Sequence, residues 1–488
     1  MGVSKYRMNK NMQRFTVVSV LVTCFFFTLH FLRTSPTELF VVNSPFHYSD
    51  ISKYTHIFTS ILSPNCPALD EYERESRNYW QYYGFQHHMK LDEDSLSNIL
   101  RVSDEQENAL GRVHSELMNK YLHDEHPLYQ HMRKQVERNN KPNNKGIVYV
   151  SGKNYYWLTM VSIKYIRDVL KDKETPIEIF VPFRVKNDHH CSKIEKVFSK
   201  VKCSYFTDHL TKTQIRQIKG YQYKALALLL TQFNEILYLD SDNIPISNIG
   251  DMFENQLYKK NGFISWADFW KRSTNYKYYK IAGLSRFANP ISTTPSVESG
   301  QILINKSTHL KTLLLAYYYN LYGPEYFYPL FSQGFPGEGD KETFYLASRA
   351  SNEPSYLING HKTKSFGYTN KEGKYTGQGI LQGEPSNPDN FWFLHMNYPK
   401  LYVNKLLKSG YFDKEKKRHW TKIRHAHDDG KTSEFKKSAG KDLEYEIWKI
   451  MDELLSTDFK GFQVFKDIGN DEMADYVKLQ MKTIKNQL

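Results

Sequence analysis

From residue 147 onward, short apolar segments alternate with longer segments of helical periodicity. Ile147–Val150 and Ile177–Val181 have the apolar composition of buried strands, and a helical segment ending near Leu170 separates them. A second helical segment, Tyr221–Phe233, leads into the strand Glu235–Leu239. This alternation predicts an α/β fold with a mostly parallel sheet flanked by helices. Ligands of such sheets bind at the carboxyl ends of the strands, so we look for chemistry just after these strands.

Two aspartates follow the third of these strands, with one serine between them: Asp240, Ser241 and Asp242. Two carboxylates in this position can hold one divalent cation, because Mg²⁺ and Mn²⁺ prefer oxygen ligands and leave positions open for phosphate oxygens. Such a cation neutralises the charge that develops on a diphosphate leaving group. An isolated Asp-x-Asp triplet can also cap a turn or a helix, so the preceding apolar strand is what favours a metal site.

The N-terminal part of the chain has the pattern of a membrane anchor. Residues 15–32 form an almost uncharged run, preceded by four basic residues, Lys5, Arg7, Lys10 and Arg14. A helix of this length spans about 27 Å, enough for a thin bilayer. The basic flank favours a cytoplasmic tail, residues 1–14, and a lumenal remainder. A cleaved signal peptide is the alternative, because it also combines a basic start with an apolar centre.

We interpret residues 33–142 as a stem, because the polar linker Arg138–Gly146 separates them from the strand–helix alternation. A lumenal catalytic domain with a lysine-rich C-terminal extension is then expected over residues 143–488. The net charge of +13 is dispersed and belongs to no nucleic-acid-binding module. Nucleic acid is therefore not an expected partner, whereas anionic glycans or nucleotide-sugar phosphates are. The sequence carries no signal for oligomeric state.

Three cysteines follow the apolar run. Cys191 and Cys203 flank a short helical segment, so they could form a disulfide in an oxidising compartment. Cys66 would then be free or paired with another chain. Asn305 begins the sequence Asn-Lys-Ser, which is an acceptor for N-glycosylation in the lumen.

Six blocks of sequence stand in order between residues 221 and 400. They are Tyr-Gln-Tyr-Lys-Ala-Leu (221–226), Ile-Leu-Tyr-Leu-Asp-Ser-Asp-Asn-Ile-Pro (236–245), Trp-Ala-Asp-Phe-Trp (266–270), Glu-Ser-Gly-Gln-Ile-Leu-Ile-Asn (298–305), Gly-Glu-Gly-Asp-Lys-Glu-Thr-Phe (337–344) and Phe-Leu-His-Met-Asn-Tyr-Pro-Lys (393–400). Together they resemble the fungal α-mannosyltransferases of glycosyltransferase family 71. The tryptophan-rich block resembles the α-1,2 members that branch outer-chain mannan. The similarity covers about residues 143–410.

The resemblance implies a GT-A fold, GDP-mannose as the donor, Mn²⁺ dependence and a setting in the Golgi lumen. Together with the anchor, it implies a single-pass type II protein of the Golgi membrane. The expected function is α-1,2-mannosyl transfer to mannan or N-glycan outer-chain acceptors on glycoproteins. An α-1,3-mannosyltransferase, a transferase that uses a UDP-sugar and an inactive lumenal lectin or scaffold are the alternatives.

We assign Asp240 and Asp242 to the metal and, by analogy with the wider GT-A group, His395 as a third ligand. The residues expected to bind the donor are Lys224, Ser241, Trp266, Asp268 and Lys400. The two lysines would reach the phosphates, and the tryptophan and aspartate would bind the sugar. Each assignment has a structural alternative: a lysine at a helix start, buried aromatic packing, or a core histidine.

Three acidic residues are candidates for catalysis, Glu298, Glu338 and Asp340. Glu298 could orient the acceptor hydroxyl, whereas the other two lie in a glycine-containing loop and could stabilise an oxocarbenium-like centre. Asp340 could also cap the helix that follows it. The resemblance implies retention of configuration, because GDP-mannose is an α-donor and the family product is an α-mannoside. Double displacement would need Glu338 or Asp340 as nucleophile, whereas front-face attack needs no protein base, and the sequence does not choose between them.

Overall fold

The computed structural model describes residues 49–72, 93–185, 189–284, 295–335, 337, 339–358, 363–410, 417–425 and 432–487. All of these residues belong to the larger of two units of the chain, Phe46–Leu488. The expected tail and membrane anchor lie outside the described residues. Within the ranges given above, every helix is too short or too polar to cross a membrane.

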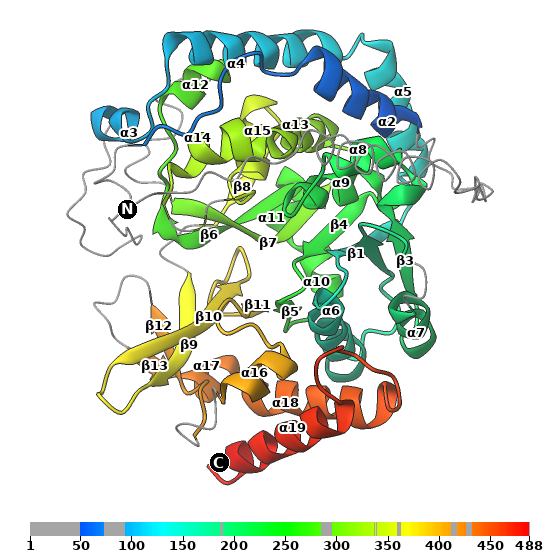
Figure 1. Cartoon of the computed structure of the whole chain (residues 1–488), viewed down its shortest axis with the longest axis vertical. Helices are drawn as coiled ribbons and strands as arrows, with labels where there is room; N and C mark the ends of the chain where they lie inside the picture. The colour runs from blue at the N-terminus through cyan, green and yellow to red at the C-terminus, as the bar shows by residue number, and fades with distance from the viewer. Residues whose placement is uncertain are drawn as a thin grey trace, which may run out of the picture. The chain divides into compact units, whose positions relative to one another are not determined.

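A seven-stranded sheet forms the centre of the larger unit, with strand order β3-β2-β1-β4-β7-β6-β8 (Figure 1). Its strands are β1 (Lys145–Val150), β2 (Ile177–Val181), β3 (Val201–Tyr205), β4 (Glu235–Leu239), β6 (Phe263–Lys271), β7 (Pro295–Asn305) and β8 (Tyr356–Leu357). The strands β1 to β4 are parallel where they pair, whereas β7 runs antiparallel to β4 and β6. The expected α/β architecture and its three strands are thus confirmed, in a mixed sheet with flanking helices.

The strand β4 occupies the middle of this sheet, between β1 and β7. Its residues Ile236–Leu239 are buried, which is why the run is apolar without alternation. The helix α9 (Gln222–Leu230) is buried along its whole length, and α6 (Tyr155–Lys164) is buried from Tyr156 onward. The residues just after β4 therefore lie near the middle of the sheet edge, with β1 on one side and β7 on the other.

A second, six-stranded sheet has the order β13-β12-β9-β10-β11-β5 and is antiparallel throughout. Its strands are β5 (Asn243–Pro245), β9 (Lys364–Thr369), β10 (Tyr375–Gly383), β11 (Phe391–His395), β12 (Lys422–His425) and β13 (Thr432–Glu434). The short strand β5 begins directly after Asp242, and it pairs with β11 so that Asn243 lies opposite His395. This pairing joins the end of β4 to the last residue of β11.

Helices from the expected stem pack in the same core as the sheet. They are α2 (Ser49–His56), α3 (Glu93–Ile99), α4 (Asp104–Glu116) and α5 (Pro127–Asn139), and they run along one side of the larger unit with α13 (Leu310–Leu321) beneath (Figure 1). The Tyr318 hydroxyl donates to the Leu62 carbonyl at 2.8 Å, and the Tyr54 hydroxyl donates to the Tyr121 carbonyl at 2.9 Å. The polar linker near residue 142 therefore does not divide the packing.

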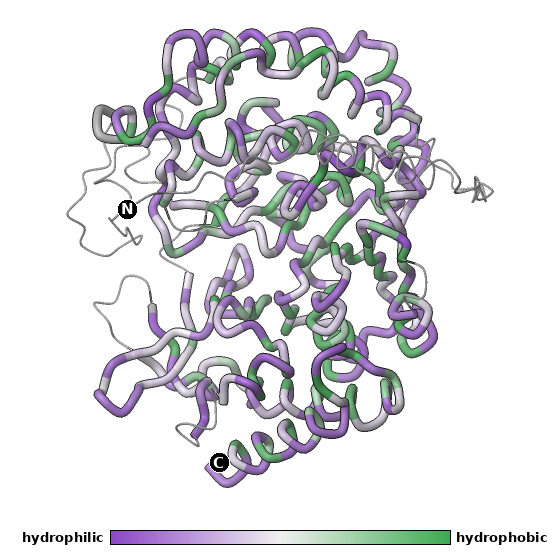
Figure 2. Tube along the Cα trace, in the orientation of Figure 1, coloured by the Kyte–Doolittle hydropathy of each residue, from purple (hydrophilic) through white to green (hydrophobic). Residues whose placement is uncertain are grey.

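The C-terminal region, including part of the lysine-rich extension, contributes to a second core cluster. The helices α18 (Leu443–Glu453) and α19 (Asn470–Lys485) pack on each other, and α18 contacts α6. Figure 2 shows hydrophobic residues gathered along the central strands, whereas α4 and α19 alternate between hydrophilic and hydrophobic residues. This alternation is the pattern of helices with one buried face.

The disulfide between Cys191 and Cys203 is present, and it links α7 (His190–Val197) to β3. Cys66 is a free, partly buried thiol. Asn305 ends β7, is partly exposed, and accepts a hydrogen bond from the Ser307 amide at 2.9 Å. The disulfide expected from the cysteine spacing is therefore confirmed.

Candidate active site

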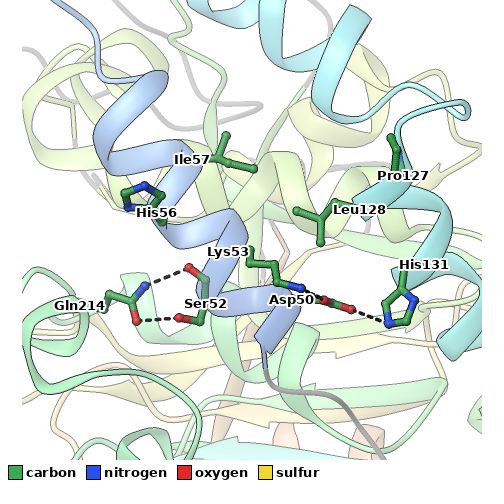
Figure 3. Close-up of a pocket in the computed structure, with 9 residues that line it drawn as sticks. All are labelled: Asp50, Ser52, Lys53, His56, Ile57, Pro127, Leu128, His131 and Gln214. Carbon is green, nitrogen blue, oxygen red and sulfur yellow. Dashed lines mark hydrogen bonds and ion pairs between the residues drawn. The ribbon is translucent and has the colours of Figure 1, made fainter.

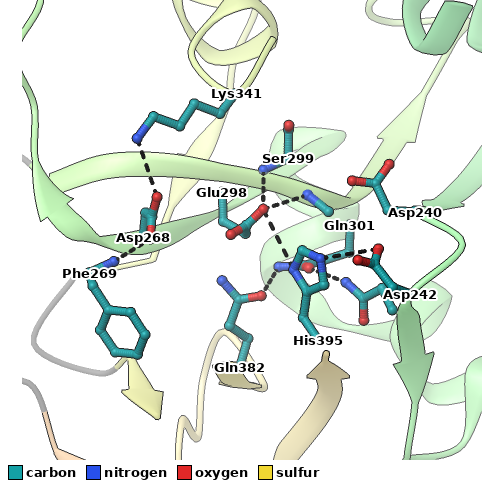
Figure 4. A network of polar contacts seen from close by, with 12 residues as sticks. Asp240, Asp242, Asp268, Phe269, Glu298, Ser299, Gln301, Lys341, Gln382 and His395 are labelled. Carbon is teal, nitrogen blue, oxygen red and sulfur yellow. Dashed lines mark hydrogen bonds and ion pairs between the residues drawn. The ribbon is translucent and has the colours of Figure 1, made fainter. Parts of the chain in front are cut away.

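Three side chains converge just beyond β4. Asp240, Asp242 and His395 each place one ligand atom within 4.8 Å of the others (Figure 4). Backbone hydrogen bonds fix their positions: the Asp240 amide donates to the Gly300 carbonyl at 2.8 Å, and the Met396 amide donates to the Asp242 carbonyl at 3.0 Å. Two carboxylates and an imidazole form a donor set that suits Mn²⁺ and related divalent cations.

His395 lies between two acidic groups. Its Nε2 is 3.4 Å from Asp242 Oδ1, and its Nδ1 is 3.7 Å from Glu298 Oε1. Burial alone would lower the pKa of His395, but the negative charges of Asp242 and Glu298 raise it to about 9. Burial alone would raise the pKa of Asp242, whereas the positive charges of His395 and Lys400 lower it. The acidic groups thus create a site that attracts positive charge.

Gly300 makes the approach of His395 possible. A Cβ atom at this position would overlap the imidazole ring. Glu298 Oε1 accepts hydrogen bonds from the amides of Ser299 and Gly300 at 3.0 and 2.8 Å. Glu298 is therefore fixed to its own strand and faces the histidine, in a position to orient the ring.

Lys400 makes an ion pair with Asp242, and its side chain is 39% exposed. It reaches the site from the segment after β11, as expected from the sequence. Because the Lys400 side chain is partly exposed, its ammonium group could move from Asp242 to the phosphate of a ligand. Its position is compatible with the expected donor contact.

Lys224 differs from Lys400 because it is 3% exposed. Its Nζ lies 3.2 Å from Asp240 Oδ1 and 2.9 Å from Asp340 Oδ2, and it donates to the Ser299 carbonyl at 2.8 Å. Burial alone would lower the pKa of Lys224, but the two aspartates raise it. With its donors used inside the protein, Lys224 holds the acidic residues in place; it is not open to a phosphate.

Asp268 and Lys341 form a second pair along the same network (Figure 4). Asp268 Oδ2 is 3.3 Å from Lys341 Nζ, and Asp268 Oδ1 accepts from the Phe269 amide at 2.6 Å. Burial raises the pKa of Asp268 to about 6, with Lys341 opposing the increase and Glu298 adding to it. In Figure 4, Glu298 lies between this pair and His395, so acidic groups line the site from end to end.

Two of the expected donor contacts have structural roles. Trp266 is 1% exposed, its indole N–H donates to the Gly383 carbonyl at 2.9 Å, and its ring packs edge-on against Phe393. The Ser241 hydroxyl donates to the Val150 carbonyl at 3.1 Å and fastens the Asp-Ser-Asp turn to β1. The ring and the hydroxyl are therefore both bonded within the protein, and their roles in donor binding stay predictions.

Asp340 is 4% exposed, and its carboxylate is held by Lys224 and by the Ser299 hydroxyl at 3.3 Å. Its carbonyl oxygen accepts from the Thr343 amide at 3.0 Å, at the beginning of α15 (Thr343–Ala350). The expected helix cap by the Asp340 side chain is therefore wrong: Glu342 occupies the N-cap position of α15 without a side-chain cap bond, and the Asp340 carboxylate faces the site. Glu338 lies outside the described residues.

Other residues of the site escaped the sequence analysis. The Tyr238 hydroxyl donates to Asp240 Oδ1 at 2.9 Å. Behind Asp242, the side-chain Nδ2 of Asn243 donates to Gln301 Oε1 at 2.6 Å. Gln301 contacts Gln382, and Gln382 Nε2 donates to the Ala267 carbonyl at 3.1 Å. The sequence could have indicated Tyr238, because it lies two residues before Asp240. Residues two apart in an extended chain point to the same side. The glutamines had no such local signal.

A cavity of about 770 Å³ lies elsewhere, between α2, α5 and α8 (Lys212–Arg216) (Figure 3). Its polar residues are bonded to one another: Lys53 donates to Asp50 at 3.1 Å, and Ser52 pairs with Gln214. The cavity shares no residue with the Asp240–Asp242–His395 group, so we place no part of the site there.

Comparisons with known proteins show which family the chain resembles in sequence. A family model described as "Mannosyltransferase putative" matches residues 144–296 and 291–386, which include Asp240, Asp242 and Asp340. The chain is 31% identical over 461 residues to the α-1,2-mannosyltransferase MNN24 of Candida albicans, covering 77% of this chain and 64% of that protein. It is 36% identical to MNN2 of the same organism, covering 53% and 50% of the two chains.

The α-1,2-mannosyltransferase MNN2 of Saccharomyces cerevisiae is 32% identical, over 60% of this chain and 52% of that protein. The chain thus spans between half and two thirds of the length of these relatives. Among solved structures, the galactosyltransferase LgtC aligns with 44% of this chain and 74% of its own at 14% identity, with a TM-score of 0.29. On the sequence matches, the chain belongs to the family of putative mannosyltransferases.

Proposed function

We propose that this chain is an α-1,2-mannosyltransferase of the GT-A type that transfers mannose from GDP-mannose to mannan or N-glycan outer-chain acceptors with retention of configuration. The observation that carries the proposal is the convergence of Asp240, Asp242 and His395 at the end of β4, in a chain of the mannosyltransferase family. The relatives named as α-1,2-mannosyltransferases support the choice of reaction.

The same three residues fit a divalent cation such as Mn²⁺. Their ligand atoms lie close together, and the acidic groups around them favour positive charge. When bound, the cation would neutralise charge on the diphosphate of the donor. Glu298 would keep the His395 ring in its orientation, and Lys224 and Tyr238 would keep Asp240 in place.

Lys400 would bind the diphosphate of the donor, since it is the accessible lysine on the Asp242 carboxylate. Asp268, beside Lys341, would accept a hydrogen bond from a sugar hydroxyl. Asp340 is buried and bonded to Lys224 and Ser299, which favours an orienting role over that of a nucleophile. We propose front-face attack, in which the leaving phosphate takes the proton of the acceptor hydroxyl and no protein base is needed.

We also propose that the protein resides in the Golgi membrane, with residues 15–32 as a retained anchor and the catalytic residues in the lumen. The apolar run with its basic flank supports this topology. The measurement is N-terminal sequencing of the protein isolated from cells. An N-terminus near residue 36 would replace the anchor by a cleaved signal peptide.

The reaction is tested by incubating the purified full-length chain with GDP-mannose, Mn²⁺ and an α-mannobiose acceptor, and determining the product linkage. We expect an α-1,2-mannoside that fails to form after chelation of the metal. An α-1,3 product or activity with UDP-sugars alone would identify one of the alternative transferases. A folded protein that binds mannobiose and neither transfers nor hydrolyses the donor would be a lectin.

A further inference from the structure

Glu342 follows directly on two residues of the site, Asp340 and Lys341, and is itself 1% exposed. Its Oε1 accepts hydrogen bonds from the Ser296 hydroxyl at 2.7 Å and from the Val297 amide at 3.0 Å, both at the beginning of β7. One carboxylate therefore ties the segment before α15 to the start of a central strand.

The other oxygen of Glu342 faces Arg272, just past the end of β6, with Nε 3.6 Å from Oε2. The Arg272 side chain is fully buried, and its guanidinium lies 4.9 Å from the ring centre of Tyr345, one helical turn after Glu342. Burial alone would lower the pKa of Arg272, but the charge of Glu342 raises it. Each buried charge thus depends on the other, because neither has water around it.

The side chains just before Glu342 reach opposite ends of the site. Asp340 contacts Lys224 at 2.9 Å, and Lys224 contacts Asp240. Lys341 Nζ lies 3.3 Å from Asp268. The position of Asp340 and Lys341 therefore determines two ion pairs of the site. Glu342 anchors these two residues, because it contacts Arg272 just after β6 and bonds to β7.

We infer that Glu342 and Arg272 are positioning residues for the transfer reaction, which hold Asp340 and Lys341 against Lys224 and Asp268. The inference rests on the proposed function. Neither Glu342 nor Arg272 contacts the Asp240–Asp242–His395 group, so they act through the two residues that precede Glu342. A displacement of about 1 Å in a catalytic site can cost about 100-fold in rate, which makes such an attachment important for turnover.

The chain offers a matched control for a purely structural ion pair. Glu444 is also 1% exposed, its Oε2 lies 3.2 Å from Arg418 Nε, and its Oε1 accepts from the His419 amide at 2.8 Å. It lies at the start of α18 and shares no residue with the site. Loss of Glu444 should therefore affect stability alone.

The experiment compares full-length Glu342→Gln and Glu444→Gln, assayed for mannosyl transfer well below their unfolding temperatures. We expect both variants to unfold at lower temperature than the wild type. Glu342→Gln leaves the buried Arg272 without its counter-charge, and Glu444→Gln removes one of the two carboxylates that pair with Arg418. Only Glu342→Gln should lose kcat, by about 10- to 100-fold. Its affinity for GDP with Mn²⁺ in calorimetry should stay within about 3-fold of the wild type, because Glu342 contacts none of Asp240, Asp242 and His395, and GDP lacks the mannose that Asp268 would bind.

Two further variants keep the inference testable if Glu342→Gln does not fold. Arg272→Met/Glu342→Met replaces both charges by apolar side chains, which should recover stability, yet it removes the bonds to Ser296 and Val297 and should keep kcat low. Ser296→Ala removes a single bond to Glu342 and should lower kcat by several-fold. Equal kcat values in Glu342→Gln and Glu444→Gln, or an apolar pair that restores kcat together with stability, would overturn the inference. A wild type without transfer would instead refute the proposed function.

Discussion

Two lysine–aspartate pairs in the site are chemically alike and differ in their access to solvent. Lys400 pairs with Asp242 and is 39% exposed, whereas Lys224 pairs with Asp340 and is 3% exposed. An exposed ammonium group can leave its partner when a phosphate or a cation arrives. A buried one cannot leave without a large desolvation cost. The comparison divides the site into two parts. In the exchanging part, around Asp242, the lysine can give up its carboxylate partner to a ligand. In the part that holds geometry, around Asp340, the buried lysine keeps the aspartates in fixed positions.

The largest expected effect is at the exchanging part. Asp242→Asn removes one charge from the proposed cation site, so cation and diphosphate binding should weaken together and transfer should fall by about 1000-fold or more. Transfer rates at saturating Mn²⁺ measure this, with circular dichroism to show that the fold is kept. Asp475→Asn, an exposed position on α19, is the control and should leave the rate unchanged. Near-normal turnover of Asp242→Asn would remove the metal from this part of the site.

A smaller effect is expected for His395→Ala. If the imidazole is a ligand, its loss should raise the Mn²⁺ concentration needed for half-maximal transfer by about 10- to 100-fold, with less change in the KM for the acceptor. The control is His114→Ala, which removes a buried histidine that bonds to the Tyr319 hydroxyl at 2.8 Å, far from the site in the chain. That variant should lose stability with an unshifted Mn²⁺ curve. An unshifted curve for His395→Ala would make His395 a structural residue as well.

The last expected effect is on stability and not on rate, and it concerns Asp268, the partner of Lys341. The pKa of Asp268 is raised to about 6 in the folded protein, whereas an aspartate in the unfolded chain titrates at about 4. Between these values the folded state keeps a proton that the unfolded state has lost, so this group lowers wild-type stability as the pH rises from about 4 to 6. Asp268→Asn does not titrate. Its free energy of unfolding relative to wild type should rise across this window by up to about 3 kcal/mol.

Urea denaturation of Asp268→Asn and wild type at several pH values measures this difference. Asp475→Asn serves again as the control, and its difference from wild type should stay level. A level difference for Asp268→Asn would mean that Asp268 keeps an ordinary pKa, paired as a carboxylate with Lys341. The contrast between the two parts of the site would then rest on lysine exposure alone.

Local patterns predicted the central part of the fold well. The strands β1, β2 and β4 lie where apolar runs indicated them, because strands inside a sheet are buried on both faces. The stem was harder to interpret. Its helices α4 and α5 are charged on one face, and their buried faces belong to the same core cluster as Tyr318, which lies far along the chain. A polar linker next to them says nothing about such packing.

The sequence by itself determined that two carboxylates stand at the end of a buried strand, since Asp240 and Asp242 depend on β4 alone. Only the tertiary structure decided which residues surround them. His395 arrives through the pairing of β5 with β11, Lys224 is buried beside Asp340, and Trp266 lies in the core. The physical reason is that burial and pairing depend on contacts between segments far apart in sequence, whereas strand formation follows from a local apolar run.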